Sequence, residues 1–466
     1  MFEQSNLKIH VLEILQDENW TKLSNVLEQE FNQTPNQVKV LEVTPDTVTV
    51  LSEALHIARE KLVEQNDLYF KTVKQIYKSL RNAVVYNPKG QILIAGSDTI
   101  LNDTIKILGC LKENETGWDC LKMLLQFLSN LVIKNKLVSK KVWQLFSNDL
   151  KDLIRNNVCL YHSSALLYNI IHVNRHLLEE NNDIIKYILD SYKQNNSNEY
   201  VTFLIELFLK NATLNKTYVN YNVENRMLCL EMMKEIIDDD KTWVTQELLD
   251  KTWVTQELLD VLSEQFKKKS DCILKTVTNY LKEIEPFEVT LLLDILASVS
   301  SDESYAEYLQ KDKSLLINCA FLLKSIHEVG RNSENNFSVI PKLSQLDNSS
   351  DQEILEHPSY GFKASIVRML ANLCWKHRNN QDLVRELECI PLLLDCCNID
   401  ARNPFIIQWV IFAIRNVCEN NTQNQDIIAA MSTDGVISSE TLCQMGITLH
   451  SDEQQTITMM PLNSNK

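Results

Sequence analysis

The sequence predicts an all-α, armadillo/HEAT-like helical-repeat fold, an α-solenoid. First, Asn372-Leu373-Cys374 and Asn416-Val417-Cys418 lie 44 residues apart, and each Asn is followed nine residues later by a Gln-Asp pair. A period of roughly 40 to 47 residues is typical of stacked armadillo or HEAT units. Second, the 466 residues include only 8 Gly and 9 Pro. Helices tolerate such a scarcity of turn residues, whereas strands joined by tight hairpins do not.

A third observation is that the core of the motif, an apolar residue, any residue, Asn and an apolar residue, recurs upstream. It is centred on Asn82, Asn130, Asn169 and Asn211, then fades over a long stretch and is clear again at Asn372 and Asn416. The long interval before Asn372 has room for three further units and a polar loop, which gives about seven to nine units in all. We therefore expect irregular armadillo-like repeats over 1–329, a long polar surface loop over 330–358, a C-terminal domain over 359–450 and a disordered tail over 451–466.

The last unit illustrates the local pattern. Asn403 is expected to cap a helix whose first position is Pro404. Residues at helical spacing then follow on one stripe, namely Phe405, Trp409, Phe412 and Asn416. We expect Phe405 and Trp409 to be structural core residues, largely buried between the last two units.

The repeat asparagines are the candidate binding residues. An Asn amide can both donate to and accept from the backbone of an extended peptide, and in armadillo arrays the third helix of each unit lines a groove. The alternative is that the Asn side chain ties down the neighbouring loop between units. The spacing alone is compatible with both interpretations. The candidate groove residues are Asn82, Asn130, Asn169, Asn211, Asn372, Asn416 and Phe412.

Charge and composition indicate the class of partner. Lys and Arg total 46 against 62 Asp and Glu, a formal net charge of -16 that repels nucleic acid and anionic membrane. Other proteins are the expected partners, including ones with basic segments, and self-association remains open. The sequence has no run of 18 apolar residues and no secretory leader pattern, so membrane insertion is not expected. The 12 cysteines read as small buried hydrophobic residues of a cytoplasmic protein.

Catalytic patterns are sparse. The glycines do not form a phosphate-binding loop, so no nucleotide cofactor is expected. His172 and His176 have the i, i+4 spacing of a helical metal site, with Glu179 and Glu180 nearby. A metal-dependent hydrolase is therefore one alternative, but no third ligand is evident and a solvated helix face is favoured. We expect no enzyme activity, no metal and no other cofactor.

Several short motifs follow one another between 361 and 416: Gly361-Phe362-Lys363, Ile366-Val367-Arg368, Asn380-Gln381-Asp382, Asn403-Pro404-Phe405, Trp409 and Ala413-Ile414-Arg415-Asn416. In this order they resemble the C-terminal domain of the ataxin-10 family over roughly 90 residues. The resemblance implies a non-enzymatic, armadillo-like scaffold with roles in cytokinesis and cell division and in neuron survival and neurite outgrowth. It also implies a cytoplasmic location that is perinuclear, centrosomal or midbody-associated. The ending from Gln454 to Lys466 lacks the basic, apolar character expected of the family.

Two further features need an interpretation. A transport-receptor-like adaptor for extended basic peptides would repeat Trp four residues before each Asn, whereas this chain has Lys78, Gln126, Ala165, Leu207, Arg368 and Phe412 there. That adaptor is the first alternative to the scaffold, and the metal-dependent hydrolase is the second. The ten residues from Lys241 to Asp250 are repeated without change from Lys251 to Asp260. Because no structural repeat here has that period, we interpret the copy as a tandem duplication or a gene-model error.

Overall fold

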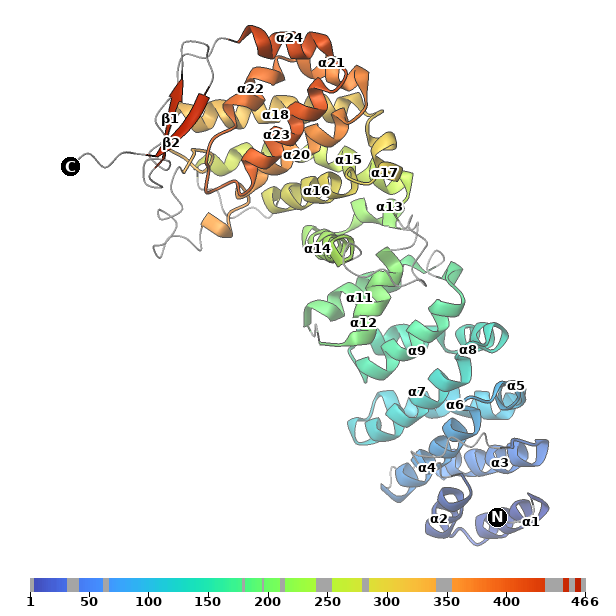
Figure 1. The fold of residues 1–466 in the computed structure, drawn as a ribbon. Helices are drawn as coiled ribbons and strands as arrows, with labels where there is room; N and C mark the ends of the chain where they lie inside the picture. The colour runs from blue at the N-terminus through green and yellow to red at the C-terminus, as the bar shows by residue number, and fades with distance from the viewer. Residues whose placement is uncertain are drawn as a thin grey trace. The chain divides into compact units, whose positions relative to one another are not determined.

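The computed structural model forms two compact units, residues 1–221 and 222–466, referred to below as unit 1 and unit 2. It describes residues 4–31, 42–61, 67–177, 181–194, 197–209, 214–239, 254–278, 285–340, 354–431, 447–451 and 457–461. Figure 1 shows that nearly every described segment is a helix. The predicted all-α helical-repeat class is therefore confirmed.

Unit 1 consists of helices throughout its described residues. Short 3-10 turns occur before α7 and at the end of the unit. The elements are α1 (Gln4–Gln16), α2 (Trp20–Phe31), α3 (Pro45–Lys61), α4 (Asp67–Val84), α5 (Pro88–Gly96), α6 (Asp98–Lys112), η2 (Glu115–Gly117), α7 (Trp118–Val132), α8 (Lys136–Arg155), α9 (Leu160–Val173), α11 (Asn182–Gln194), α12 (Glu199–Leu209), α13 (Leu214–Thr217) and η3 (Tyr218–Asn220).

Unit 2 contains the remaining helices and one pair of strands. The helical elements are α14 (Val223–Asp239), α15 (Gln256–Lys269), η5 (Ser270–Thr278), α16 (Glu285–Val299), α17 (Glu303–Leu309), α18 (Lys313–Asn332), α20 (Phe362–Cys374), α21 (Arg378–Glu386), α22 (Cys389–Asp395), α23 (Ile406–Cys418) and α24 (Thr422–Ala430). The strands β1 (Ile447–Ser451) and β2 (Ile457–Pro461) pair antiparallel, with Leu449 opposite Met459. These strands were not expected from the sequence, and β2 lies within the tail that was predicted to be disordered over 451–466.

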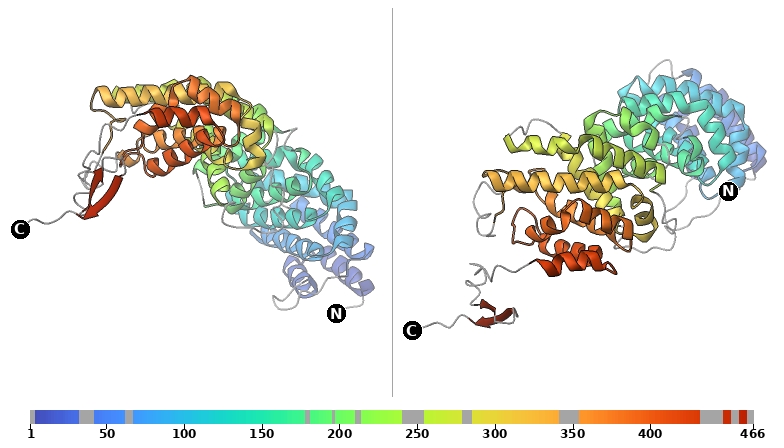
Figure 2. Two further views of the ribbon diagram at one scale, coloured as in Figure 1. Left: turned by 45° about the horizontal axis from the view of Figure 1, so that its top comes forward. Right: turned by 90° about the horizontal axis from the view of Figure 1, so that it is seen from above.

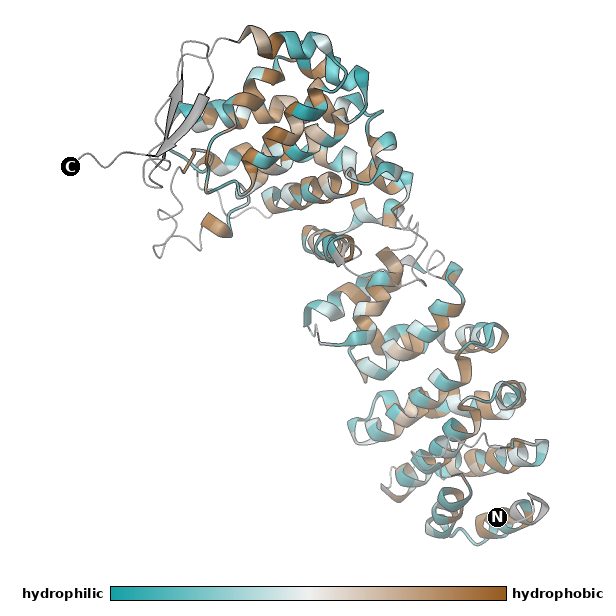
Figure 3. Cartoon of the chain, in the orientation of Figure 1, coloured by the Kyte–Doolittle hydropathy of each residue, from teal (hydrophilic) through white to brown (hydrophobic). Residues whose placement is uncertain are grey.

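The repeat helices form one row in each unit. In unit 1, α2, α4, α7, α9 and α12 each pack on the next; in unit 2, α14, α16, α20 and α23 do the same. Each row buries apolar side chains between its helices, for example Leu80, Leu128 and Leu370, all fully buried. Figure 3 shows the resulting pattern, in which brown apolar positions alternate with teal polar ones along the helices. Figure 2 gives two further views, in which the long yellow-orange α18 lies beside the orange α20, on which it packs.

Four row helices, α4, α7, α20 and α23, end in the same way because of the residues after their repeat Asn, whereas α9 ends at its C-cap Asn174 without a left-handed residue. Four residues after the Asn the backbone is left-handed, with φ of 52° at Tyr86, 54° at Lys134, 51° at Lys376 and 54° at Asn420. One residue later, a side chain caps the next helix. Each cap accepts a hydrogen bond from the backbone N–H three residues further on; the caps are Asn87 for α5, Asn135 for α8, His377 for α21 and Asn421 for α24. The period seen in the sequence is therefore the interval at which this helix end and the following helix cap recur.

The structure divides the chain differently from the boundary expected near 330. Helices α16 and α18 pack on α20, so the residues on both sides of 330–358 belong to unit 2. The predicted surface loop begins inside α18, and its described part contains buried side chains, Phe337 and His357. Gly330 permits this fold, because a side chain there would collide with the backbone carbonyl of Phe337.

Two local predictions are wrong. α9 ends at Val173 with Asn174 as its C-cap, so His172 and His176 do not share a helix as the i, i+4 reading required. α23 begins at Ile406 rather than at Pro404, and its N-cap is Phe405, with φ of 60°. Phe405 is 70 % exposed and is not the core residue expected of it. The residue 44 positions earlier, Gly361, is the left-handed N-cap of α20 with φ of 73°, so the repeat requires this backbone turn and Phe405 accommodates it.

The tandem decapeptide lies only partly within the described residues. The first copy, Lys241 to Asp250, lies outside them. The second copy begins α15: Thr255 caps the helix by accepting from the Leu258 backbone N–H, and Leu258 and Leu259 are buried. The second copy therefore supplies a helix start and core residues.

A buried carboxylate connects three elements of unit 2. Glu288 on α16 has no exposed surface and accepts hydrogen bonds from Arg226 on α14, at 2.8 and 3.0 Å, and from Lys269 at the end of α15, at 2.9 Å. Burial by itself would raise the pKa of Glu288, but the hydrogen bonds from Arg226 and Lys269 outweigh it and lower that pKa. The carboxylate is therefore ionised in the folded protein and holds two cations that are themselves largely buried.

We expect Glu288→Ala to lower the free energy of unfolding by about 3–5 kcal/mol, because it leaves Arg226 and Lys269 without their counter-charge. Chemical denaturation followed by circular dichroism measures the change. Glu285→Ala is the matched control, since Glu285 is an exposed carboxylate in the first turn of the same helix. A Glu288→Ala protein as stable as the Glu285→Ala protein would contradict the role of the buried charges.

Candidate functional site

The repeat asparagines connect neighbouring helices of a row. Asn82 Nδ2 on α4 donates to the Phe31 carbonyl at the end of α2, at 2.7 Å. Asn372 Nδ2 on α20 donates to the Ala297 carbonyl of α16 at 3.0 Å, and Asn416 Nδ2 on α23 donates to the Ala371 carbonyl of α20 at 2.9 Å. All three asparagines are buried. Their amides therefore donate to carbonyls near helix ends, where the regular intrahelical N–H partners are missing.

Asn169 makes the corresponding contact in a weaker form. Its Nδ2 donates to Ser129 Oγ at 2.7 Å and to the Ser129 carbonyl at 3.4 Å, and the residue is half-buried. Ser129 directly precedes Asn130, just as Ala371 directly precedes Asn372. The register of the contact is therefore the same in the two units.

A set of glutamines completes the connection from the other side. Gln91 Nε2 donates to the carbonyls of Asn130 and Ile133, and Gln381 Nε2 donates to those of Asn416 and Glu419, at 2.9 and 3.2 Å in both cases. Gln310 Nε2 makes the same pair of bonds to Asn372 and Trp375. Each glutamine thus closes the C-terminal turn of a helix in the following repeat.

Two candidate asparagines differ from the rest. Asn130 is half-buried, and within the described part of the chain its side-chain amide has no hydrogen-bond partner. It is therefore the repeat Asn whose amide is available to another molecule. Asn211 lies outside the described residues.

The partly exposed face of the row in unit 1 carries a line of polar contacts. Arg81 Nη1 on α4 donates to Gln126 Oε1 on α7 at 2.8 Å, and Gln126 Nε2 lies 3.0 Å from His162 Nε2 on α9. Burial, and then the charge of Lys122, lower the pKa of His162, so its ring is neutral at pH 7. This line connects three successive helices.

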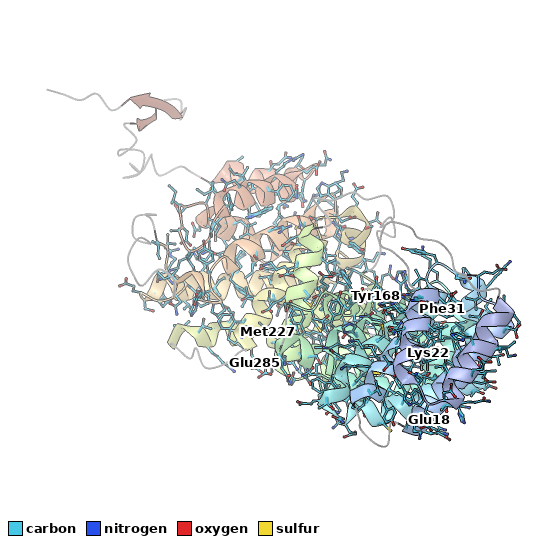
Figure 4. All side chains as sticks on the ribbon, turned by 90° about the horizontal axis from the view of Figure 1, so that it is seen from below. Glu18, Lys22, Phe31, Tyr168, Met227 and Glu285 are labelled. Carbon is cyan, nitrogen blue, oxygen red and sulfur yellow. The ribbon has the colours of Figure 1, made fainter. Side chains whose placement is uncertain are left out.

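The line leads to a group of rings that we call the aromatic cluster: Tyr161, Tyr168 and His172 on α9 with Tyr200 and Phe203 on α12. Ring centroids lie 5.1 Å apart for Tyr161 and Tyr200, and 5.7 Å for Tyr168 and Phe203. Tyr161 is 49 % and Phe203 40 % exposed. Tyr168 is labelled in Figure 4, which draws the side chains seen from below. Exposed contiguous aromatics of this kind mark interaction sites.

In unit 2 the corresponding face carries Trp409 and Phe412, both partly buried, with ring centroids 6.2 Å apart. Arg368 on α20 places its guanidinium 5.0 Å from the centre of the Trp409 ring and donates to Ser298 Oγ. Trp409 is therefore covered by a cation of its own chain. Phe412, a predicted groove residue, lies beside this pair.

The aromatic cluster and the capping glutamines are not among the residues expected from the sequence. Tyr161, Tyr168 and His172 have helical spacing, but aromatic residues at that spacing fill cores more often than they line surfaces. The Gln nine residues after Asn372 and after Asn416 was noted as a repeat signal, and Gln91 stands nine residues after Asn82 in the same way. That spacing could have identified the glutamines as the partners of the asparagines.

Neither a metal site nor a membrane span emerges from the described ranges. In them no three His, Cys, Asp or Glu side chains gather where they could hold a metal ion. The helices there are also too short or too polar to cross a membrane.

The chain is similar to a known family of proteins. A family model described as the spinocerebellar ataxia type 10 protein domain matches residues 362–460, beginning at the first residue of α20. Ataxin-10 of Macaca fascicularis is 30% identical over 399 residues, 83% of this chain and 81% of the relative. Ataxin-10 of Homo sapiens is 30% identical over 396 residues, with the same coverage of 83% and 81%. An ataxin-10 homolog of Dictyostelium discoideum is 41% identical over 103 residues, 22% of this chain and 17% of the relative.

Gln381 and Gln425 allow a matched test of the inter-repeat bonds, because both follow a repeat Asn by nine residues. Gln381 is buried and closes the end of α23, whereas Gln425 is exposed and bonds only the Cys418 carbonyl of its own repeat. We expect Gln381→Ala to cost about 1–3 kcal/mol of unfolding free energy. Gln425→Ala should change it by less than about 0.5 kcal/mol. Urea denaturation measures the unfolding free energy of the two variants. Equal losses of unfolding free energy would rule out the proposed role of Gln381.

Proposed function

The chain belongs to the ataxin-10 family, and on that premise we propose that it is a non-enzymatic scaffold that binds other proteins through the exposed faces of its helix rows. The observation that carries this proposal is the partly exposed face of the unit 1 row. In that row the half-buried Asn130 amide has no partner in the described part of the chain, and Tyr161 and Phe203 of the aromatic cluster are exposed. An unpartnered amide can bind a peptide backbone, and exposed rings can serve as apolar anchors, as on peptide-binding surfaces.

The repeat asparagines have separate roles in this proposal. Asn82, Asn372 and Asn416 brace neighbouring helices, so the interpretation that ties these side chains to the structure of the array applies to them. Asn130 retains the groove role, and Asn211 is kept as a candidate on the sequence pattern alone. The binding surface is thus narrower than the whole set of repeat asparagines.

The two units of the proposed scaffold differ in net charge. Unit 1 contains 24 Lys and Arg against 25 Asp and Glu, whereas unit 2 contains 22 against 37. Nearly all of the net charge of -16 therefore belongs to unit 2. Long-range attraction of basic partner segments is accordingly a property of unit 2, and added salt should weaken it.

The transport-receptor-like alternative receives no support from the positions four residues before each Asn. Lys78 pairs with Glu28 at 2.8 Å, Gln126 bonds to Arg81 and His162, and Arg368 covers Trp409. These side chains already have partners within the chain and do not form the repeated exposed tryptophans that such a receptor uses.

The cellular role that we propose follows from the family. It comprises cytokinesis and cell division at centrosomal or midbody assemblies, together with support of neuron survival and neurite outgrowth, from a cytoplasmic and perinuclear location. Supporting this is the resemblance of the 361–416 motifs and the similarity to ataxin-10 over most of the chain.

We expect Asn130→Ala to weaken capture of partner proteins from a cell lysate while leaving the melting temperature within about 1 °C of the wild type, because its amide holds nothing in the fold. Asn372→Ala is the matched control: it removes an amide at the equivalent repeat position that bonds two groups, so it should lower the melting temperature. Quantitative pull-downs and thermal denaturation give the two readouts. An Asn130→Ala protein that captures its partners unchanged would remove Asn130 from the binding surface.

The cellular proposal has its own test. Depleting the protein from dividing cells should raise the fraction of binucleate cells, and re-expressing the wild-type chain should restore the normal fraction. The Asn130→Ala chain, at matched protein level, should restore it only in part. Normal division after complete depletion would refute the proposed role in cytokinesis.

A further inference from the structure

The helix ends of unit 1 carry apolar side chains that the fold leaves in solvent. Leu137, in the first turn of α8, is 81 % exposed, and Tyr86, between α4 and α5, is 77 % exposed. These are the two most exposed large apolar side chains of the described residues. Ile92 on α5 and Ile133, the C-cap of α7, are exposed as well. Exposed apolar side chains mark an interaction site when they are contiguous.

Hydrogen bonds between neighbouring helix ends bring these residues together. Gln91 Nε2 on α5 donates to the Ile133 carbonyl at 3.2 Å, and Gln91 Oε1 accepts from Asn135 Nδ2 at 3.1 Å. Ile92 directly follows Gln91, and Leu137 lies two residues after Asn135. Helices α5 and α8 also pack on each other. The exposed residues of the two helices therefore belong to one surface.

Lysines accompany the apolar residues on both helices. They are exposed and form no ion pair within the described part of the chain, and they are Lys89, Lys134, Lys136 and Lys140. The segments that carry them, 84–97 and 131–148, contain no Asp or Glu. Asp98, the carboxylate that follows the first segment, already pairs with Lys141 at 2.9 Å. We call these four lysines, together with Tyr86, Ile92, Ile133 and Leu137, the basic apolar patch.

The equivalent positions in unit 2 show that the repeat does not require this chemistry. Counted from the helix cap, the second and fifth residues of α21 and α24 are polar or acidic, namely Asn379, Asp382, Gln423 and Asp426. In α5 and α8 the same positions are held by Lys89, Ile92, Leu137 and Lys140. The apolar and cationic character is therefore a property of unit 1, at positions where the array tolerates other residues.

We propose that the basic apolar patch binds an acidic segment of a partner protein that carries Asp or Glu beside two or more apolar side chains. The proposal rests on the scaffold function above and names the chemistry of one of its partners. The apolar side chains of the segment pack on Ile92 and Leu137, which removes both from water. Its carboxylates meet the lysines of the patch, and this attraction selects against basic segments at the same place.

An anionic membrane offers the same two chemistries, but the charge of the chain favours a protein segment. A membrane surface is charged over its whole area and faces an entire side of the protein. The chain carries a formal net charge of -16, which opposes that approach. A single acidic segment touches only the patch, and beyond a Debye length of about 8 Å the remaining charges are largely screened.

The test uses the full chain and a fluorescently labelled amphipathic peptide of about 18 residues, with Leu on one helical face and Glu on the other. Fluorescence polarisation measures the dissociation constant. We expect the same peptide with Lys in place of Glu to bind at least about tenfold more weakly, and likewise the peptide with Ser in place of Leu. Equal binding of the Glu and Lys peptides would overturn the proposal.

Charge-reversal variants locate the cationic part of the site. Lys136→Glu together with Lys140→Glu should weaken binding of the Glu peptide about 10- to 100-fold. Lys22→Glu together with Lys186→Glu is the matched control, because it makes the same charge change at exposed lysines of α2 and α11 outside the patch. The control should stay within about threefold of the wild type. An equal loss in both variants would assign the effect to net charge and contradict the patch.

An apolar variant separates burial from charge. Ile92→Ser together with Leu137→Ser should weaken binding about tenfold or more, while the melting temperature stays near that of the wild type because both side chains are exposed. Unchanged affinity would show that the apolar residues are not part of the site.

Two further outcomes separate this proposal from its neighbours. The full chain should not sediment with vesicles of phosphatidylserine and phosphatidylcholine. Sedimentation that the Ile92→Ser, Leu137→Ser variant loses would assign the patch to membranes and overturn the protein partner. A chain that does not bind the Glu peptide, but captures partner proteins in a manner that depends on Asn130, would refute the patch and leave the scaffold function standing.

Discussion

The array depends on side-chain amides that satisfy backbone carbonyls of neighbouring helices. A helix leaves its last carbonyls without intrahelical partners, and in a stack of short helices many of these ends are buried. Here Asn416 donates to a carbonyl of the preceding row helix, and Gln381 donates to carbonyls at the end of the helix that carries Asn416. Each repeat is therefore held in register with its neighbours by directional bonds as well as by apolar packing. The 44-residue period of the sequence is the distance between such points.

This requirement separates structural from binding residues. An amide that closes a buried helix end cannot also hold a ligand, so Asn82, Asn372 and Asn416 are part of the fold. Binding is left to places where the pattern is incomplete. Asn130 keeps the repeat position without the inter-helix bond. Exposed rings of α9 and α12 lie in the same row of helices.

The two units differ in how their charged residues are distributed. Unit 1 is nearly neutral, whereas unit 2 holds most of the acidic excess and also places one carboxylate, Glu288, wholly inside. That carboxylate is stable only because Arg226 and Lys269 turn inward to meet it. Lys269 belongs to a run of three lysines at the end of α15 that by composition alone would be assigned to solvent. The amino-acid composition therefore gives the acidic excess of unit 2, but it does not show which charged residues form buried ion pairs.

The sequence by itself determined the helical class, the period, the family and the positions of the repeat asparagines, because each of these follows from the spacing of residue types along the chain. Only the tertiary structure decided which amides are used internally, since a hydrogen-bond partner such as the Ala297 carbonyl lies 75 residues from Asn372 and no local pattern marks it. The same holds for Phe405: its spacing fits a buried stripe, but the left-handed turn that starts α23 directs it to solvent. The division between units 1 and 2 likewise depends on contacts between segments that are distant in the sequence. Helical periodicity fixes which residues share a face, whereas the neighbour that covers that face is chosen by packing in three dimensions.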